Sequence, residues 1–167
     1  MDDVIRYSDH IVFNSFHQWN KFKDKVRSSG KQIECGLRLN PKYSEIDTDI
    51  YNPCFTGSRL GITPEQFHPD QFDGLHFHTM CEQNSDTLER TLKVVDDTFG
   101  SYIKQMKWLN FGGGHHITRS DYDIETLIRC IQFAQDSYGV QVYLEPGEAV
   151  ALNTGYLVST VLDTIEN

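Results

Sequence analysis

Hydrophobic positions along the chain alternate between two spacings. Five short apolar runs have the length and composition of buried strands: residues 10–13, 33–39, 72–78, 108–111 and 140–144. Three segments carry apolar residues at every third or fourth position, the spacing of an amphipathic helix: residues 16–26, 88–99 and 124–138. Strand then helix, repeated at roughly 30–40 residues, indicates βα units on a parallel sheet.

Glycine and capping residues set the expected ends of the helices. Gly30, Gly100 and Gly139 follow the last apolar positions of the three helical segments, where a C-terminal glycine is common. Asp86 and Glu89 have the spacing of a capping pair and predict the start of the second helix. A long polar loop separates the second and third strands.

Polar residues follow several of the expected strands. Arg38, His78, a glycine run and Glu145 each lie at or just after a strand end. A (β/α)8 barrel gathers its site from many strand ends, whereas a doubly wound sheet concentrates its site at one switch point. The pattern therefore favours an α/β fold with a partial (β/α)8, TIM-like barrel of about five units. Five units do not close such a barrel, so the fold is either open or a piece of something longer.

Composition restricts the class of partner. The 167 residues carry a net charge of −9, which argues against nucleic acid. Mean hydropathy is −0.48, and no apolar run approaches the ~20 residues that span a bilayer. The first residues lack the pattern of a signal peptide. The four cysteines form no CxxC pair and fit reduced thiols: Cys35, Cys54, Cys81 and Cys130. We expect a cytoplasmic protein with no membrane or nucleic-acid partner.

Three consecutive glycines, Gly112, Gly113 and Gly114, follow the fourth expected strand. Residues without a Cβ allow several backbone N–H groups to converge on one anion, and a strand that runs into such a turn is a usual phosphate site. A tight turn with no chemical role is the alternative interpretation, although one or two glycines would be enough for it.

Ionisable side chains at the strand ends suggest two kinds of chemistry. His76 and His78 lie two residues apart on one strand, so they point to the same face. Glu145 follows a buried apolar run and needs a cationic or hydrogen-bonding partner. With His115 and His116, the two histidines suggest zinc and a metal-dependent barrel hydrolase, which would need a carboxylate at a matching strand end. A structural role is the alternative for each of these residues.

Longer motifs at these positions resemble one enzyme family. The resemblance is to the pyridoxal-phosphate-dependent decarboxylases of the alanine-racemase barrel fold, and it is carried by FH at 77–78, NFGGG at 110–114 and LEPG at 144–147. The segments 52–54 and 57–61 are similar to the subgroup that acts on carboxynorspermidine or carboxyspermidine. The resemblance runs over essentially the whole chain. It implies pyridoxal 5'-phosphate as cofactor, a polyamine substrate, a role in polyamine biosynthesis and a homodimer.

The resemblance also implies roles for single residues. His78 would stack on the pyridine ring of the cofactor. Glu145 would pair with the pyridine nitrogen, whose protonation an ionised carboxylate favours. The three glycines would hold the phosphate, with Cys81 and Gly147 nearby. We therefore expect His78 and Glu145 to be the catalytic residues and no metal ion to take part.

One departure from the family concerns the extent of the chain. No lysine matches the early Tyr-Ala-x-Lys-like motif that forms the covalent bond to the cofactor. We divide the chain into a partial barrel that binds the cofactor, residues 1–150, and a C-terminal segment, residues 151–167. This segment is expected to contain a connection and the first strand of a C-terminal β-domain, over residues 156–165. The resemblance therefore implies an internal fragment that covers about the last five βα units of the barrel, and we expect it to have no decarboxylase activity of its own. A barrel piece that binds a phosphate compound, or nothing, is the non-enzymatic alternative.

A second departure is Glu148, which stands where most relatives have an arginine that helps to bind phosphate. A carboxylate repels a phosphate dianion, so we expect Glu148 to point elsewhere. Our hypothesis is that Glu148, or the acidic loop with Glu45, Asp47 and Asp49, attracts the cationic tail of a polyamine. A solvated glutamate is the alternative. Arg38 is a further candidate for substrate binding, with a surface cation as the alternative.

Overall fold

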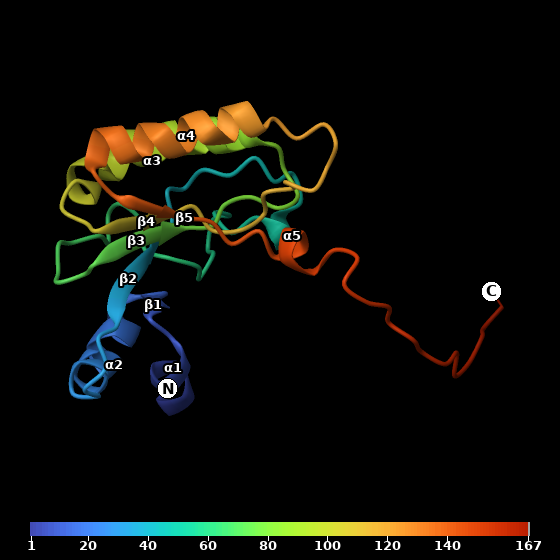
Figure 1. The fold of residues 1–167 in the computed structure, drawn as a ribbon, viewed down its shortest axis with the longest axis horizontal. Helices are drawn as coiled ribbons and strands as arrows, with labels where there is room; N and C mark the ends of the chain where they lie inside the picture. Colours follow the sequence, from blue (N-terminus) through green and yellow to red (C-terminus); the bar gives the residue numbers. More distant parts are fainter. Residues whose placement is uncertain (167) are drawn as a thin grey trace.

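The computed structural model describes residues 1–166 and contains a five-stranded sheet flanked by helices (Figure 1). The strands are β1 (His10–Phe13), β2 (Glu34–Leu39), β3 (Gly74–Phe77), β4 (Trp108–Asn110) and β5 (Gln141–Tyr143). All are parallel, and their order across the sheet is their order along the chain. A doubly wound sheet reverses its order at a switch point, so this topology confirms the expected partial barrel.

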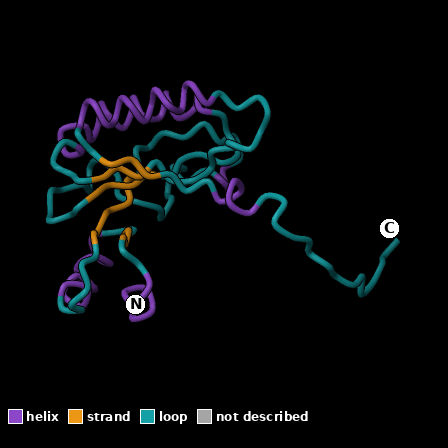
Figure 2. Tube along the Cα trace, viewed as in Figure 1, coloured by secondary structure: helices purple, strands orange, loops and turns teal. Residues whose placement is uncertain are grey.

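Three of the four connections between neighbouring strands contain an α-helix, and the helices lie outside the sheet. They are α1 (Asp2–Tyr7), α2 (Phe16–Arg27), α3 (Ser85–Ile103), α4 (Ile124–Tyr138) and α5 (Gly147–Ala151), with a short 3-10 turn η1 (Asp49–Tyr51) in the loop after β2. Figure 1 shows α3 and α4 side by side over β3–β5, with α1 and α2 near β1 and β2. Because the strands are parallel, the loops that follow them gather at one end of the sheet (Figure 2).

The ends of α3 differ from the sequence prediction. Asn84, and not Asp86, is the N-cap, because the Asn84 side chain accepts a hydrogen bond from the Ser85 amide. Asp86 lies inside the first turn and forms an ion pair with Arg90 at 3.0 Å. Gly100 does not end the helix, which continues to Ile103. The end of α4 is as predicted: Gly139 adopts a left-handed conformation with φ of 71°.

Successive residues of the central strands face opposite sides of the sheet. On the side of the helices, three leucines in register have no exposed surface: Leu37, Leu75 and Leu109. On the inner side, Trp108 packs over Gly36 and Gly74, which are its register neighbours across the sheet. A Cβ at Gly74 would lie 1.9 Å from the Trp108 ring, and one at Gly36 would lie 2.2 Å from it. Both glycines are therefore required by the indole, which is 2% exposed.

The chain beyond α5 forms no helix or strand as far as residue 166 and extends away from the barrel (Figure 1). The predicted strand over 156–165 is therefore not formed in this structure. A strand needs a neighbour for its backbone hydrogen bonds, and none lies beside this segment, where Tyr156 is 100% and Leu162 94% exposed. The division into residues 1–150 and 151–167 stays a prediction. Within residues 1–166, no helix combines the length and the apolarity needed to cross a membrane.

Candidate active site

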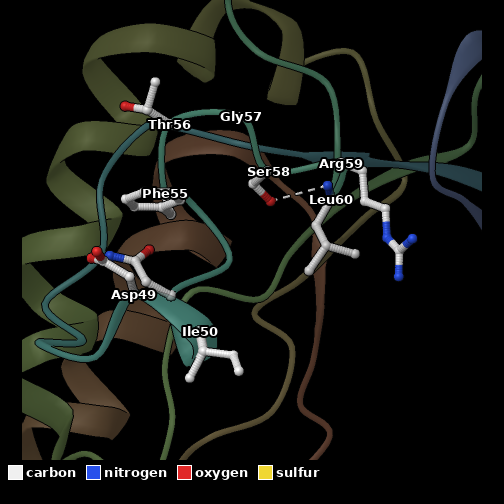
Figure 3. Close-up of a pocket in the computed structure, with 9 residues that line it drawn as sticks. Asp49, Ile50, Phe55, Thr56, Gly57, Ser58, Arg59 and Leu60 are labelled. Atoms are coloured by element: carbon white, nitrogen blue, oxygen red, sulfur yellow. Dashed lines mark hydrogen bonds between the residues drawn. The ribbon is translucent and has the colours of Figure 1, made fainter.

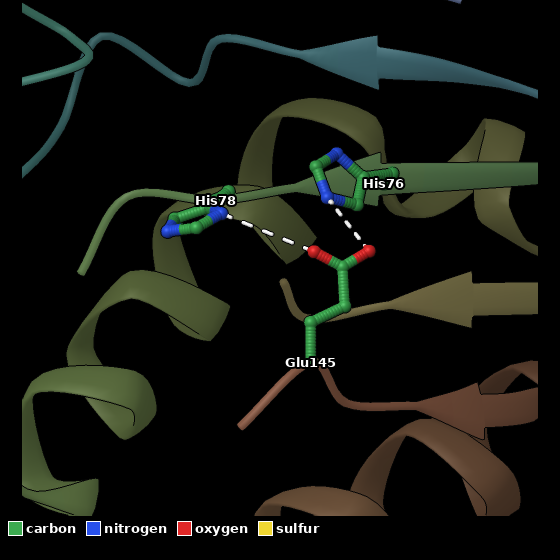
Figure 4. A group of neighbouring side chains, drawn as sticks. All are labelled: His76, His78 and Glu145. Atoms are coloured by element: carbon green, nitrogen blue, oxygen red, sulfur yellow. Dashed lines mark ion pairs between the residues drawn. The ribbon is translucent and has the colours of Figure 1, made fainter. Parts of the chain in front are cut away.

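Two histidines and one glutamate meet where β3 and β5 end (Figure 4). His76 belongs to β3, His78 follows its last residue, and Glu145 lies two residues after β5. The His76 Nε2 atom is 3.5 Å from Glu145 Oε1, and the His78 Nδ1 atom is 4.0 Å from Glu145 Oε2. His76 is buried, whereas the His78 and Glu145 side chains are 38% and 46% exposed. The prediction that His76 and His78 share a face is confirmed.

Glu145 is held by more than the histidines. The Asn110 side-chain amide donates a hydrogen bond of 2.9 Å to Glu145 Oε1, and the Glu145 backbone amide donates one to the carbonyl of Gly112. His76, and after it Asn110 and His78, outweigh the cost of burial and lower the pKa of Glu145 to about 2. The carboxylate is therefore ionised at neutral pH, as the sequence-based role requires.

The register of the sheet explains why these side chains meet. Arg38, His76, Asn110 and Tyr143 pair with one another across β2, β3, β4 and β5, so they form one row near the carboxyl ends of the strands. Arg38 is half-buried and donates a hydrogen bond of 3.2 Å to the backbone carbonyl of His78. Its guanidinium therefore steadies the loop after β3. Burial, together with the Arg38 and His76 charges, lowers the pKa of His78.

The glycine run packs tightly against the loop after β3. Gly112 and Gly114 have φ values of 71° and 82°, which non-glycine residues rarely adopt. A Cβ at Gly112 would lie 2.4 Å from the carbonyl oxygen of Phe77, and one at Gly114 would lie 2.1 Å from that of Met80. The glycines are thus required by close backbone contact, whatever ligand they hold.

The amides of the run are not equally available to a ligand. The Gly112 amide already donates to the Asn110 side chain at 2.8 Å. Within residues 1–166, the amides of Gly113 and Gly114 have no hydrogen-bond acceptor. The sequence-based prediction of a phosphate cradle of three glycines is therefore restricted to two of them.

A pocket of about 260 Å³ opens beside these amides; its lining includes His78, Cys81, Gly114, His115, Gly147 and Glu148. His115 is 4% exposed, and neither of its ring nitrogens has a hydrogen-bond partner within residues 1–166. Burial lowers the pKa of His115 to about 4, so the ring is neutral. Unpartnered buried nitrogens are uncommon, and these two belong to a residue of the pocket lining.

Glu148 lines this pocket, and the expectation that its carboxylate points away from a phosphate stays a prediction. Its carboxylate lies 3.1 Å from His116 Nε2 and accepts a hydrogen bond of 3.0 Å from the Thr118 hydroxyl. The Glu148 carboxylate, whose charge would repel a phosphate, therefore faces His116. Glu45 forms a two-point ion pair with Arg90 and is not free to attract a polyamine.

A larger pocket, of about 430 Å³, lies in the loop after β2 (Figure 3). Its lining includes Asp49, Ile50, Phe55 and Arg59, and Ile50 is 84% exposed. None of the predicted catalytic or cofactor-binding residues contributes to it. The histidine and glutamate cluster therefore stays the candidate site.

Sequence reasoning underrated three residues of this site. The spacing of His76 from His78 places both on one face, but it does not indicate that His76 pairs with Glu145. Asn110 has no signal of its own, since only the register of β3 and β4 brings it to Glu145. His115 was considered only as a metal ligand, and its burial beside the pocket depends on the path of the glycine loop.

Comparisons with known proteins show which enzymes the chain is similar to. No protein-family model matches the chain. A carboxynorspermidine/carboxyspermidine decarboxylase from Campylobacter jejuni is 49% identical over 99% of this chain and 43% of its own length. A carboxyaminopropylagmatine decarboxylase from Synechocystis is 40% identical over 98% of this chain and 43% of its own length.

A solved structure of a similar enzyme shares the fold of this chain. The crystal structure of carboxynorspermidine decarboxylase from Campylobacter jejuni, complexed with norspermidine, superposes with a TM-score of 0.76 at 47% identity, over 99% of this chain and 42% of that chain. The chain thus spans less than half the length of its relatives. The alignments over nearly the whole chain and the agreement in fold together show that the chain is similar to one part of the carboxynorspermidine/carboxyspermidine decarboxylases.

Proposed function

We propose that this chain forms the cofactor-binding part of a pyridoxal-phosphate-dependent decarboxylase that removes CO2 from carboxylated polyamines. The observation that carries the proposal is the meeting of Glu145 with His76 and His78 beside the glycine loop. The relatives named carboxynorspermidine/carboxyspermidine and carboxyaminopropylagmatine decarboxylase support this class of substrate, a carboxylated chain with several amines.

The residues present fit pyridoxal phosphate at both of its ends. At one end, Glu145 offers an ionised carboxylate to a protonated ring nitrogen. At the other end, the Gly113 and Gly114 amides are open and the neighbouring pocket contains the unpartnered His115 ring. A Cβ at Gly113 would lie 3.1 Å from the His78 ring and 2.9 Å from the Glu145 carbonyl oxygen, so a side chain there would crowd the space between them.

Each residue has a separate task in this proposal. When bound, pyridoxal phosphate supplies a conjugated ring that accepts the electron pair left on Cα as CO2 departs. Glu145 keeps a proton on the ring nitrogen, and His76 and Asn110 hold its carboxylate in place. His78 provides a flat surface for the ring, and the Gly113 and Gly114 amides fix the phosphate.

The charge of the chain suits a polyamine. The net charge is −9, and a cationic substrate is concentrated near an acidic surface. Asp47 and Asp49 lie in the loop after β2, and Glu148 lines the pocket beside His78. Because Glu45 is engaged by Arg90, the attraction proposed for the acidic loop rests on Asp47 and Asp49.

Equilibrium dialysis of the chain against pyridoxal phosphate tests the cofactor part of the proposal. Glu145→Gln removes a charge-assisted interaction of about 1.5–3 kcal/mol, so it should weaken binding about 10- to 100-fold. Glu34→Gln is the matched control, since Glu34 also pairs with a histidine, at 3.3 Å, but lies at the opposite end of the sheet. Equal affinity of both variants for pyridoxal phosphate, or no binding by the unaltered chain, would contradict the proposal.

Release of CO2 from carboxynorspermidine tests the reaction. The residues that line the pocket within 1–166 include no lysine. We therefore expect the 167-residue chain to bind the cofactor without a covalent bond and to release no CO2. Turnover by the purified chain alone would show that the covalent lysine is not needed, and would refute this part of the reasoning.

A further inference from the structure

His76, His78 and Glu145 also form a set of metal ligands. Each offers one donor atom, and the three donor atoms lie within 4.8 Å of one another. Two imidazoles and one carboxylate are the protein ligands of several catalytic zinc sites, in which water takes the fourth position. The carboxylate that the zinc interpretation of the sequence lacked is therefore supplied by Glu145.

The distances are close to those of a coordinated ion. Zinc–nitrogen and zinc–oxygen bonds of about 2.0–2.1 Å place neighbouring tetrahedral donors about 3.3–3.5 Å apart. The His76 Nε2 to Glu145 Oε1 distance is already 3.5 Å. The His78 Nδ1 to Glu145 Oε2 distance of 4.0 Å and the widest donor separation, up to 4.8 Å, must shorten by about 0.5–1.5 Å to reach that spacing. The 38% exposed His78 ring has room to turn.

Glu145 is the anionic ligand of the cluster, and the nearby Arg38 charge, which adds to burial in lowering the pKa of His78, opposes the binding of a cation. Within residues 1–166, no lysine or arginine forms an ion pair with Glu145, whose partners are the two histidines and the Asn110 amide. Arg38 is directed to the carbonyl of His78 instead. Asn110 holds the carboxylate from outside the cluster, as outer partners do at known metal sites.

We propose that, in the absence of pyridoxal phosphate, His76, His78 and Glu145 bind one divalent transition-metal ion of the zinc class. Glu145 and His78 are also the proposed partners of the pyridine ring. The ion and the cofactor would therefore exclude each other, and this competition, unlike the metal site, rests on the proposed function. A zinc-class metal would then act as an inhibitor of cofactor loading.

The test is titration of the metal-free, cofactor-free chain with Zn²⁺ by calorimetry, with Co²⁺ as a spectroscopic probe of tetrahedral coordination. We expect one ion per chain at this site. Loss of an outer hydrogen-bond partner weakens metal sites about 10- to 100-fold, so His76→Gln or Glu145→Gln should weaken binding at least about 100-fold. His10→Gln is the control, because His10 pairs with Glu34 at 3.3 Å and, among residues 1–166, no third donor joins that pair.

Two outcomes would overturn the metal site: no tight ion, or equal binding by the unaltered chain and by the His76→Gln and Glu145→Gln variants. Because His76 is buried, circular dichroism must show that its variant is folded, and His78→Gln is a second variant with less risk to the fold. Saturating pyridoxal phosphate should then suppress the Co²⁺ spectrum. If Zn²⁺ binds as expected but pyridoxal phosphate does not displace it, the metal site stands and the cofactor proposal fails.

Discussion

Replacement of Gly74 by alanine tests the packing beneath the active site. The new Cβ would lie 1.9 Å from the Trp108 ring, whereas ordinary carbon contacts are about 3.5–4.0 Å, so the indole must move by more than about 1.5 Å. The indole is buried and has β2 beneath it, so little room is left. Overpacking of this kind costs typically 1–3 kcal/mol, and we expect a loss at the upper end, about 3 kcal/mol.

Urea unfolding of the chain measures this loss. With a slope of about 2 kcal/mol per molar urea, 3 kcal/mol lowers the midpoint by about 1.5 M. Gly155→Ala is the matched control, because a Cβ there meets no atom within 4 Å, and its effect should stay within about 0.5 kcal/mol. In a double mutant, Trp108→Leu should relieve part of the cost of Gly74→Ala by about 1–3 kcal/mol. Equal midpoints for the two alanine variants, or strictly additive effects, would refute the reasoning.

Three further predictions use the same urea assay. Arg90 lowers the pKa of Glu45 to about 2, so the ion pair stabilises the fold at pH values above the unfolded pKa of about 4.3. This stabilisation is lost as the pH falls from about 5 towards 2, and Glu45→Gln should flatten the dependence of stability on pH over that range. Tyr138→Phe removes the hydrogen bond from the Tyr138 hydroxyl to Asp96 and should cost about 1 kcal/mol, with Tyr7→Phe at an exposed site as control. Gly139→Ala, at φ of 71°, should cost about 1 kcal/mol, and no loss would contradict a left-handed helix end.

Sequence patterns predicted the sheet well because apolar runs report burial directly. Each of the five expected strands is present, and Gly139 ends α4 as its position indicated. The start of α3 was misplaced because Asn84 and Asp86 are both good capping residues, and the choice depends on the rest of the fold. Asn84 also binds the backbone near α4, through the carbonyl of Asp121 and the amide of Asp123, contacts without any local signal.

The site was predictable where its residues follow strand ends. His78 and Glu145 were found in this way, since the carboxyl ends of parallel strands meet. Partners from distant segments were not found: Asn110 reaches Glu145 only through the register of the sheet, and Arg90 reaches Glu45 across 45 residues. The pairing of Glu45 changes its interpretation from a substrate-binding charge to a structural ion pair.

The loops after β3, β4 and β5 are fastened to one another by backbone hydrogen bonds. The Gln83 amide donates to the Gly114 carbonyl, the His116 amide to that of Gln83, and the Glu145 amide to that of Gly112. A ligand that arrives here meets a surface already in its final shape, so little conformational entropy is lost on capture. Association should follow a single exponential whose rate rises linearly with ligand concentration, without the plateau that a slow loop closure would impose.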